Sequence, residues 1–103
     1  MAHPHAADAQ EYEIKLTLYK MKMTAAAIQR RQQIFDMVKI NTLPRFKDKT
    51  VDRRTMEAMR YNLIMAERTA KTEILRKRME YNFLSEQLAA QRKNLARLKG
   101  ARG

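Results

Sequence analysis

Cysteine and tryptophan are absent from this 103-residue sequence, and glycine and proline occur only twice each. Without cysteine the chain forms neither a disulfide framework nor a thiolate metal site, an absence that fits a reducing compartment. So few glycines and prolines leave few places for turns, whereas a β-sandwich or β-barrel needs many. Two long helices need only one turn, so the composition favours an all-α chain.

Large apolar residues are also scarce. Leu, Ile, Val and Phe together make up 20 of the 103 residues, while the formal net charge is +11. This combination lies close to that of chains that stay disordered or fold on a partner. Eight methionines partly compensate, because this flexible side chain serves either as core filler or as a contact to an irregular protein surface.

Acidic residues are half as numerous as basic ones, 11 against 22. Such a surplus favours an acidic partner, whether nucleic acid, an anionic membrane or an acidic protein. No apolar stretch approaches the ~20 residues that cross a bilayer, so we expect no membrane span. The first residues have neither a basic segment nor an apolar run, so we also expect no secretory signal.

Residues able to carry catalysis are nearly missing. His3 and His5 fall in a polar N-terminal segment, and Ser85 is the single serine. Nucleophilic catalysis needs a nucleophile held next to a base, and no phosphate-binding, hydrolase or metalloprotease motif is present. We therefore expect no enzyme, no metal site, no cofactor and no small-molecule substrate.

The pattern of helix formers and breaks predicts two long helices in an extended, non-globular fold. Residues 12–23 also alternate like a strand, but the Ala-rich continuation without a turn signal favours helix. Pro44 marks the break, Asp8 is the expected cap of the first helix, and Thr50 or Asp52 that of the second. The expected segments are a flexible tail over 1–7, a helix over 8–40, a linker over 41–51, a helix over 52–99 and a basic end over 100–103.

The first helix carries two apolar stripes on nearly opposite sides. A helix of this kind is buried between neighbours, and one further helix from the same chain covers only one side. We therefore expect an outside surface to cover the other. One stripe contains Tyr12, Leu16, Tyr19, Met23, Ala26 and Met37, and the other contains Ile14, Leu18, Met21, Ala25, Ile28 and Phe35.

The second helix carries a single apolar seam with a coiled-coil spacing. The seam shifts by four residues near its middle, which is a stutter that locally unwinds a supercoil. Its residues are Met56, Met59, Leu63, Ala66 and Ala70, followed by Ile74, Tyr81, Leu84, Leu88, Leu95 and Leu98.

Basic residues are distributed along the chain in clusters, unlike the single dense block of a zipper-type DNA binder. Distributed Lys and Arg suit RNA phosphates and an acidic protein lattice equally. Phe46 lies in the basic linker, where it either anchors in a partner or packs back on its own helix ends. The clusters are Arg30–Arg31, Arg45 to Lys49, Arg53–Arg54, Arg76 to Arg78, Arg92–Lys93 and Arg97 to Lys99.

Three segments of the second helix, 70–76, 80–81 and 86–90, combine a basic Leu-containing helix, a Glu-Tyr pair and a later Glu-Gln-Leu. This pattern resembles that of microtubule inner proteins, small cilia- and flagella-associated proteins that line axonemal doublet microtubules. The resemblance implies a non-catalytic protein of the ciliary axoneme that braces the doublet by binding tubulin and neighbouring inner proteins.

On this interpretation, apolar and basic side chains would share the contact with the partner. A basic subunit of a ribonucleoprotein, or an accessory subunit of another large complex, remains the alternative. The expected apolar contacts are Tyr12, Leu16, Tyr19, Phe46, Tyr81 and Leu88, and the expected basic contacts are Arg53, Arg54, Arg92, Lys93 and Arg97.

Overall fold

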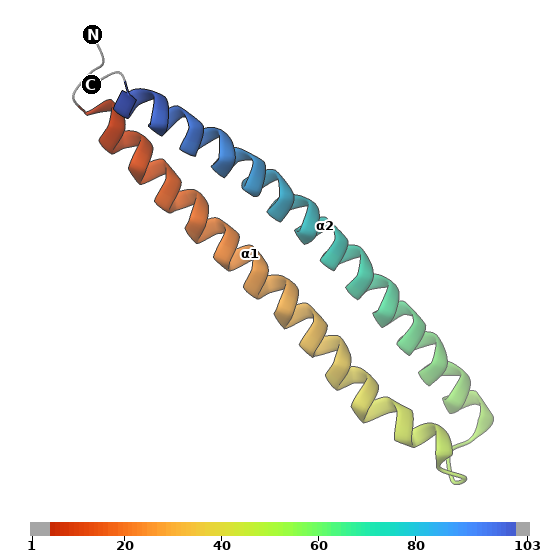
Figure 1. The fold of residues 1–103 in the computed structure, drawn as a ribbon. Coiled ribbons are helices and arrows are strands. Elements are labelled where there is room, and N and C mark those ends of the chain that lie inside the picture. Colours follow the sequence, from red (N-terminus) through yellow and green to blue (C-terminus); the bar gives the residue numbers. More distant parts are fainter. Residues whose placement is uncertain (1–4, 101–103) are drawn as a thin grey trace. The chain divides into compact units, whose positions relative to one another are not determined.

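The computed structural model describes residues 5–100, and nearly all of them are helical (Figure 1). Helix α1 spans Ala6–Thr42, the 3-10 helix η1 spans Leu43–Lys47, and helix α2 spans Arg53–Gly100. Within these residues there is no strand, so the prediction of an all-α chain with two long helices is confirmed. Residues 12–23 are helical, and so are Ala6 and Ala7 of the expected tail. The rest of that tail before residue 5, and the end after Gly100, lie outside the described residues.

The connection between the helices is ordered by two aspartates. Pro44 lies in the first turn of η1, where its missing N–H breaks no helical hydrogen bond. The Asp48 carboxylate accepts hydrogen bonds from the backbone N–H of Thr50 at 2.9 Å and from its hydroxyl at 2.6 Å. Asp52 Oδ1 accepts the backbone N–H of Thr55 at 2.8 Å. Asp52 therefore caps α2, and Thr50 does not.

The prediction that Asp8 caps α1 is wrong. The helix already begins at Ala6, and Asp8 lies within its first turn. The backbone N–H of Ala9 donates to the carbonyl oxygen of His5 at 3.0 Å, so the backbone itself closes the first turn. At this position the Asp8 carboxylate interacts favourably with the positive end of the helix dipole.

The chain divides into two structural units, which we call unit 1 and unit 2. Unit 1 comprises residues 1–26 and 78–103, and unit 2 comprises residues 27–77. In unit 1 the start of α1 lies beside the end of α2, and contacts between them join Gln10 to Asn94 and Thr17 to Gln91. The order of these contacts makes the pairing antiparallel. Unit 2 is an αα-hairpin, since η1 and the turn over residues 48–52 join its two helical segments.

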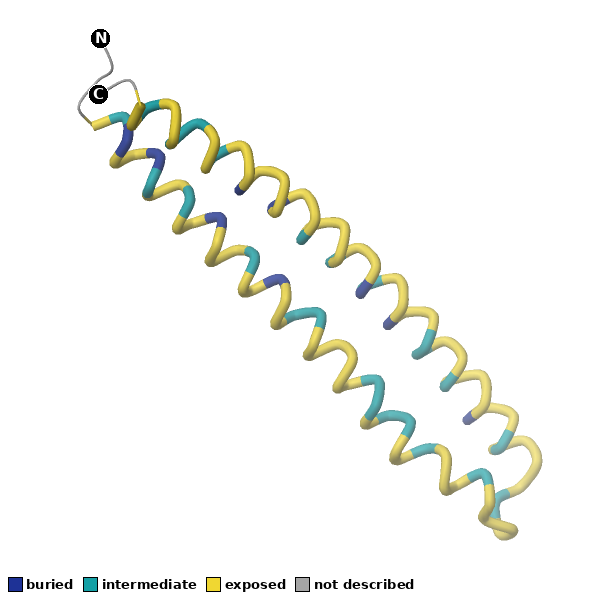
Figure 2. The backbone as a smooth tube through the Cα atoms, viewed as in Figure 1, coloured by how far each residue is buried: buried dark blue, intermediate teal, exposed yellow. Residues whose placement is uncertain are grey.

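The core of unit 1 is partly polar. On α1 the buried residues are Ala7, Gln10, Thr17 and Thr24, with Ile14 and Met21 half-buried between them. These positions are three and four residues apart, as in a coiled-coil seam. On α2 the buried residues are Leu84 and Leu88. In Figure 2 the buried positions of unit 1 lie on the side of each of its two helical segments that faces the other segment.

The core of unit 2 is small. Met59, Ala70 and Ile74 are buried on α2, and Phe35 and Val38 are half-buried on α1. In the two units, every residue of the predicted α2 seam is buried or half-buried, so that prediction is confirmed. Among the described residues, however, no side chain is fully buried. Each unit therefore has a thin core with one layer of contacts.

Only one of the two predicted α1 stripes turns inward, and only in part. Ile14, Met21, Ile28 and Phe35 are half-buried, but Leu18 and Ala25 of the same stripe are exposed. The inward positions between them are filled by residues with polar side chains, chiefly Thr17 and Thr24. The stripe that begins with Tyr12 is exposed along its whole length, as expected for a face that α2 does not cover.

Candidate protein-docking surfaces

The most prominent surface of unit 1 is an exposed stripe on α1, which we call the outer stripe: Tyr12, Leu16, Tyr19 and Met23. Their exposed fractions run from 42% for Leu16 to 68% for Tyr12. They are spaced by four, three and four residues, which is the spacing of a coiled-coil seam. At 100° per residue the centre of this stripe lies about 120° around the helix from the buried Thr17 and Thr24. In unit 1, helix α1 thus has one seam that packs against α2 and a second seam, the outer stripe, that is exposed to solvent.

Helix α2 of unit 1 also presents large apolar side chains outward. Met79 and Phe83 are each 65% exposed, and neither was predicted as a contact from the sequence. The spacing of four residues, which places both side chains on one face of the helix, is the sequence feature that could have identified them. Leu88 is only 7% exposed, so we reassign it from the expected partner contacts to the core. Tyr81 is half-buried in the same seam.

A chain of polar contacts crosses the interior of unit 1. An Arg97 Nη donates to Asn94 Oδ1 at 2.5 Å, and Asn94 Nδ2 donates to Gln10 Oε1 at 2.6 Å. Gln10 Nε2 in turn donates to Glu13 Oε2 at 3.2 Å. All three donors point the same way, from a cation to a carboxylate, so each bond polarises the next. Arg97, an expected partner contact, is thus bonded to Asn94 of its own helix and stays exposed.

Further contacts join the two segments of unit 1. The Thr17 hydroxyl lies 2.8 Å from Gln91 Oε1 and 3.0 Å from the carbonyl oxygen of Glu13. The Thr24 hydroxyl donates to the carbonyl oxygen of Lys20 at 2.8 Å, which satisfies it within its own helix. Near the chain ends, Lys99 pairs with Glu11 at 3.1 Å.

The expected partner contacts Arg92 and Lys93 are exposed on α2 of unit 1.

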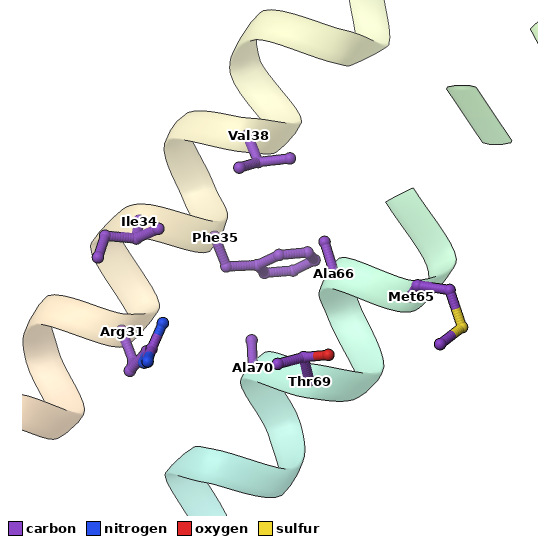
Figure 3. A pocket seen from close by; sticks show the side chains of 8 residues that line it. All are labelled: Arg31, Ile34, Phe35, Val38, Met65, Ala66, Thr69 and Ala70. Atoms are coloured by element: carbon purple, nitrogen blue, oxygen red, sulfur yellow. The ribbon is translucent and has the colours of Figure 1, made fainter. Parts of the chain in front are cut away.

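Unit 2 contains an apolar groove between its two helical segments (Figure 3). Its volume is about 270 Å³. The Phe35 side chain extends from α1 toward Ala66 of α2, and Ile34 and Met65 lie at the outer edges. The residues that line it are Arg31, Ile34, Phe35 and Val38 from α1, and Met65, Ala66, Thr69 and Ala70 from α2.

The charges around the groove form pairs of opposite sign, one of which joins Lys39 Nζ to Asp36 Oδ1 at 3.7 Å. Arg31 forms an ion pair with Glu73 across the two segments. The Lys39 ammonium lies 4.8 Å from the centre of the Phe35 ring, within range of a cation–π interaction. On the α2 side, Lys71 Nζ is 2.8 Å from Glu67 Oε1, and this hydrogen bond is the main cause that lowers the pKa of Glu67.

The turn of unit 2 has a cationic surface. Arg53 pairs with Glu57 at 3.4 Å, and Arg54 is exposed. The two aspartates of the turn are engaged with backbone and hydroxyl groups, and these hydrogen bonds lower the pKa of both Asp48 and Asp52. Phe46 is half-buried, so its ring is neither fully presented to a partner nor enclosed.

The positive charge is unequally divided between the units. Unit 2 has 13 basic and 6 acidic side chains, whereas unit 1 has 9 basic and 5 acidic. The net charges of +7 and +4 account for the total of +11. Both units therefore attract anionic surfaces, unit 2 more strongly.

Two further observations limit the chemistry of the described part of the chain. Residues 5–100 contain no group of three or more His, Cys, Asp or Glu side chains placed to hold a metal ion. Within the same residues, no helix contains an uncharged apolar stretch of the length that spans a bilayer. No protein-family model, curated protein or solved structure matches this chain.

Proposed function

We propose that this protein is a non-catalytic structural subunit that binds along the surface of a larger acidic protein assembly. The outer stripe of unit 1 is the observation that carries the proposal. Four large apolar side chains at coiled-coil spacing remain exposed on a chain in which Leu, Ile, Val and Phe together make up only 20 of 103 residues. Full burial of a large apolar side chain contributes about 1.5–3 kcal/mol, and these side chains, exposed by 42–68%, can still gain a good part of that on a partner.

The net charge of +11 adds the second requirement. Exposed cations such as Arg54, Arg92 and Lys93 contribute little by themselves but raise the rate and specificity of association with an acidic surface. Combined with the resemblance to microtubule inner proteins, this supports tubulin and neighbouring inner proteins of the ciliary doublet as the partners. The role is then static bracing, in which many weak contacts add along the helices.

The alternative, a basic subunit of a ribonucleoprotein, is favoured by one observation, the cationic turn of unit 2 around Phe46. The two functions differ in their response to salt. Binding to RNA weakens with salt in proportion to the number of phosphates contacted, whereas docking through apolar side chains persists. Release by nuclease would also occur only in the RNA-bound case.

Co-sedimentation with purified doublet microtubules tests the proposal. We expect the recombinant chain to sediment with salt-washed doublets and to resist nuclease treatment. Leu16→Glu places a charge in the outer stripe and should reduce binding by about tenfold or more. Ala89→Glu adds the same charge at an exposed position of α2 in the same unit and is the matched control.

Both variants change exposed residues, so circular dichroism should show an unchanged helix content. Equal binding by the Leu16→Glu and Ala89→Glu variants would contradict the role of the outer stripe. Recovery of the protein with ribosomes, and its release by nuclease, would contradict the microtubule assignment.

A further inference from the structure

The groove of unit 2 has the form of a receptor for a third helix. Its two walls are helical segments, and the floor on the α2 side is made of the small residues Ala66, Thr69 and Ala70. Small residues opposite Phe35 leave space that the hairpin itself does not fill (Figure 3). Interiors are normally close-packed, so an open space of about 270 Å³ beside a thin core is a surface that a partner could complete.

The lining of the groove is suited to apolar side chains. Six of its eight residues are apolar, and the two others are Arg31 and Thr69. At the rim, Ile34 and Met65 are 48% and 40% exposed. No carboxylate lines the groove. A row of apolar side chains on one face of an amphipathic helix is the ligand that this kind of groove accepts.

The charge of unit 2 indicates which residues should flank the apolar face of the ligand helix. Arg31 and Lys39 lie eight residues apart on α1, or about 12 Å along the helix, but each already pairs with a carboxylate, Glu73 and Asp36 respectively. The exposed cations nearest the rim in the helical repeat are Arg30, four residues before Ile34, and Arg68, three residues after Met65. They belong to a unit whose net charge is +7. A helix with acidic residues beside its apolar face would therefore be attracted and held in register.

We infer that the groove of unit 2 binds an acidic amphipathic helix of a partner protein, an inference that rests on the proposed function and names the partner segment. A second copy of this chain is disfavoured, because both units are positively charged. Nucleic acid presents no apolar row to fill the groove. A bilayer surface is too flat to enter a concave site between two helices.

A synthetic peptide tests this inference. The probe is a helical peptide with Leu at positions i, i+3, i+4 and i+7 and Glu on both flanks, titrated into the full chain labelled at its methionine and isoleucine methyl groups. We expect shift changes at Met65 and Ile34, and little change at Met79 of unit 1. A peptide with Lys in place of each Glu should bind at least about tenfold more weakly.

Two tryptophan variants on α2 provide a matched pair. Thr69→Trp fills the edge of the groove and should weaken binding of the acidic peptide by about tenfold or more. Thr72→Trp, at an exposed position one turn further along α2, should leave the affinity within about twofold. Both replaced residues are exposed, so helix content should stay the same in both.

Each outcome decides between the alternatives. Equal binding by the two tryptophan variants, equal binding of the acidic and basic peptides, or absence of shifts at Met65 would overturn the inference. If the groove fails but the chain still sediments with doublets through its outer stripe, the proposed function stands without this receptor. If the peptide binds as expected but doublets do not, the receptor stands and the microtubule assignment is wrong.

Discussion

Asn94 of α2 donates a 2.6 Å hydrogen bond to Gln10 of α1, and Gln10 is only 8% exposed. Two amides therefore occupy a layer that an apolar pair would fill in an ordinary helix pair. A buried polar pair contributes little net stability, but it penalises every alignment that leaves either amide without a partner. We interpret this pair as a device that sets the alignment of the two segments of unit 1.

Replacing one amide should cost more than replacing both. Gln10→Leu leaves the Asn94 amide unsatisfied in a half-buried site, so we expect a loss of about 1–3 kcal/mol. The double replacement Gln10→Leu with Asn94→Leu should restore most of the stability while permitting other alignments. A double-mutant cycle by urea unfolding measures the coupling, and additive losses would contradict the interpretation.

The buried and exposed leucines of α2 should respond differently to truncation. Leu88 is 7% exposed, and Leu88→Ala is expected to lower the free energy of unfolding by about 2–5 kcal/mol. Leu75 is 60% exposed, and Leu75→Ala should change it by no more than about 0.5 kcal/mol. Chemical unfolding of the two variants gives the comparison. Similar losses in both would mean that the seam is wrongly assigned.

The ion pair between Arg31 and Glu73 should behave as a partly exposed contact. The side chains are 48% and 33% exposed, so solvent screens the attraction and we expect at most about 1 kcal/mol. Glu73→Arg should destabilise unit 2, and adding Arg31→Glu should recover the loss. Unfolding at low and high salt checks this, because the difference between the single and double variants should shrink as salt rises.

The start of α2 should lose its cap in acid. Hydrogen bonds to Thr55 lower the pKa of Asp52 in the folded chain. A carboxyl with a lowered folded pKa contributes stability above its unfolded pKa of about 3.9, and loses it as pH falls through the folded pKa. The protection of the Thr55 amide, measured relative to its intrinsic exchange rate at each pH, should therefore fall at low pH. Asp52→Asn keeps a capping oxygen but does not titrate, and the same loss of protection in that variant would refute this cause.

The α2 seam was predictable because its apolar residues repeat at coiled-coil spacing, with Leu84 and Leu88 at its most buried positions. The inward face of α1 was harder to predict. Thr17 and Thr24 look like surface residues in the sequence, and they are buried because α1 carries two competing apolar faces and α2 covers only one. Their hydroxyls are satisfied by Gln91 and by the backbone, a condition that appears only when both helices are placed.

The outer stripe was found from the sequence, since Tyr12, Leu16 and Tyr19 were expected to contact a partner and are exposed. The groove was not. It depends on Phe35 of one segment facing Ala66 and Ala70 of the other, residues about 30 positions apart in the chain. The periodicity of one helix predicts which of its residues face inward. It does not predict whether a large or a small side chain of the other helix lies opposite each of them.

The absence of any fully buried side chain among the described residues has a consequence for the cell. A copy that has not met its assembly keeps large side chains such as Tyr12 and Met23 exposed to chaperones and proteases. We expect such copies to be removed faster than bound ones. The amount of this protein should therefore follow the amount of its binding partner, and depleting the partner should shorten its lifetime while its messenger RNA stays constant.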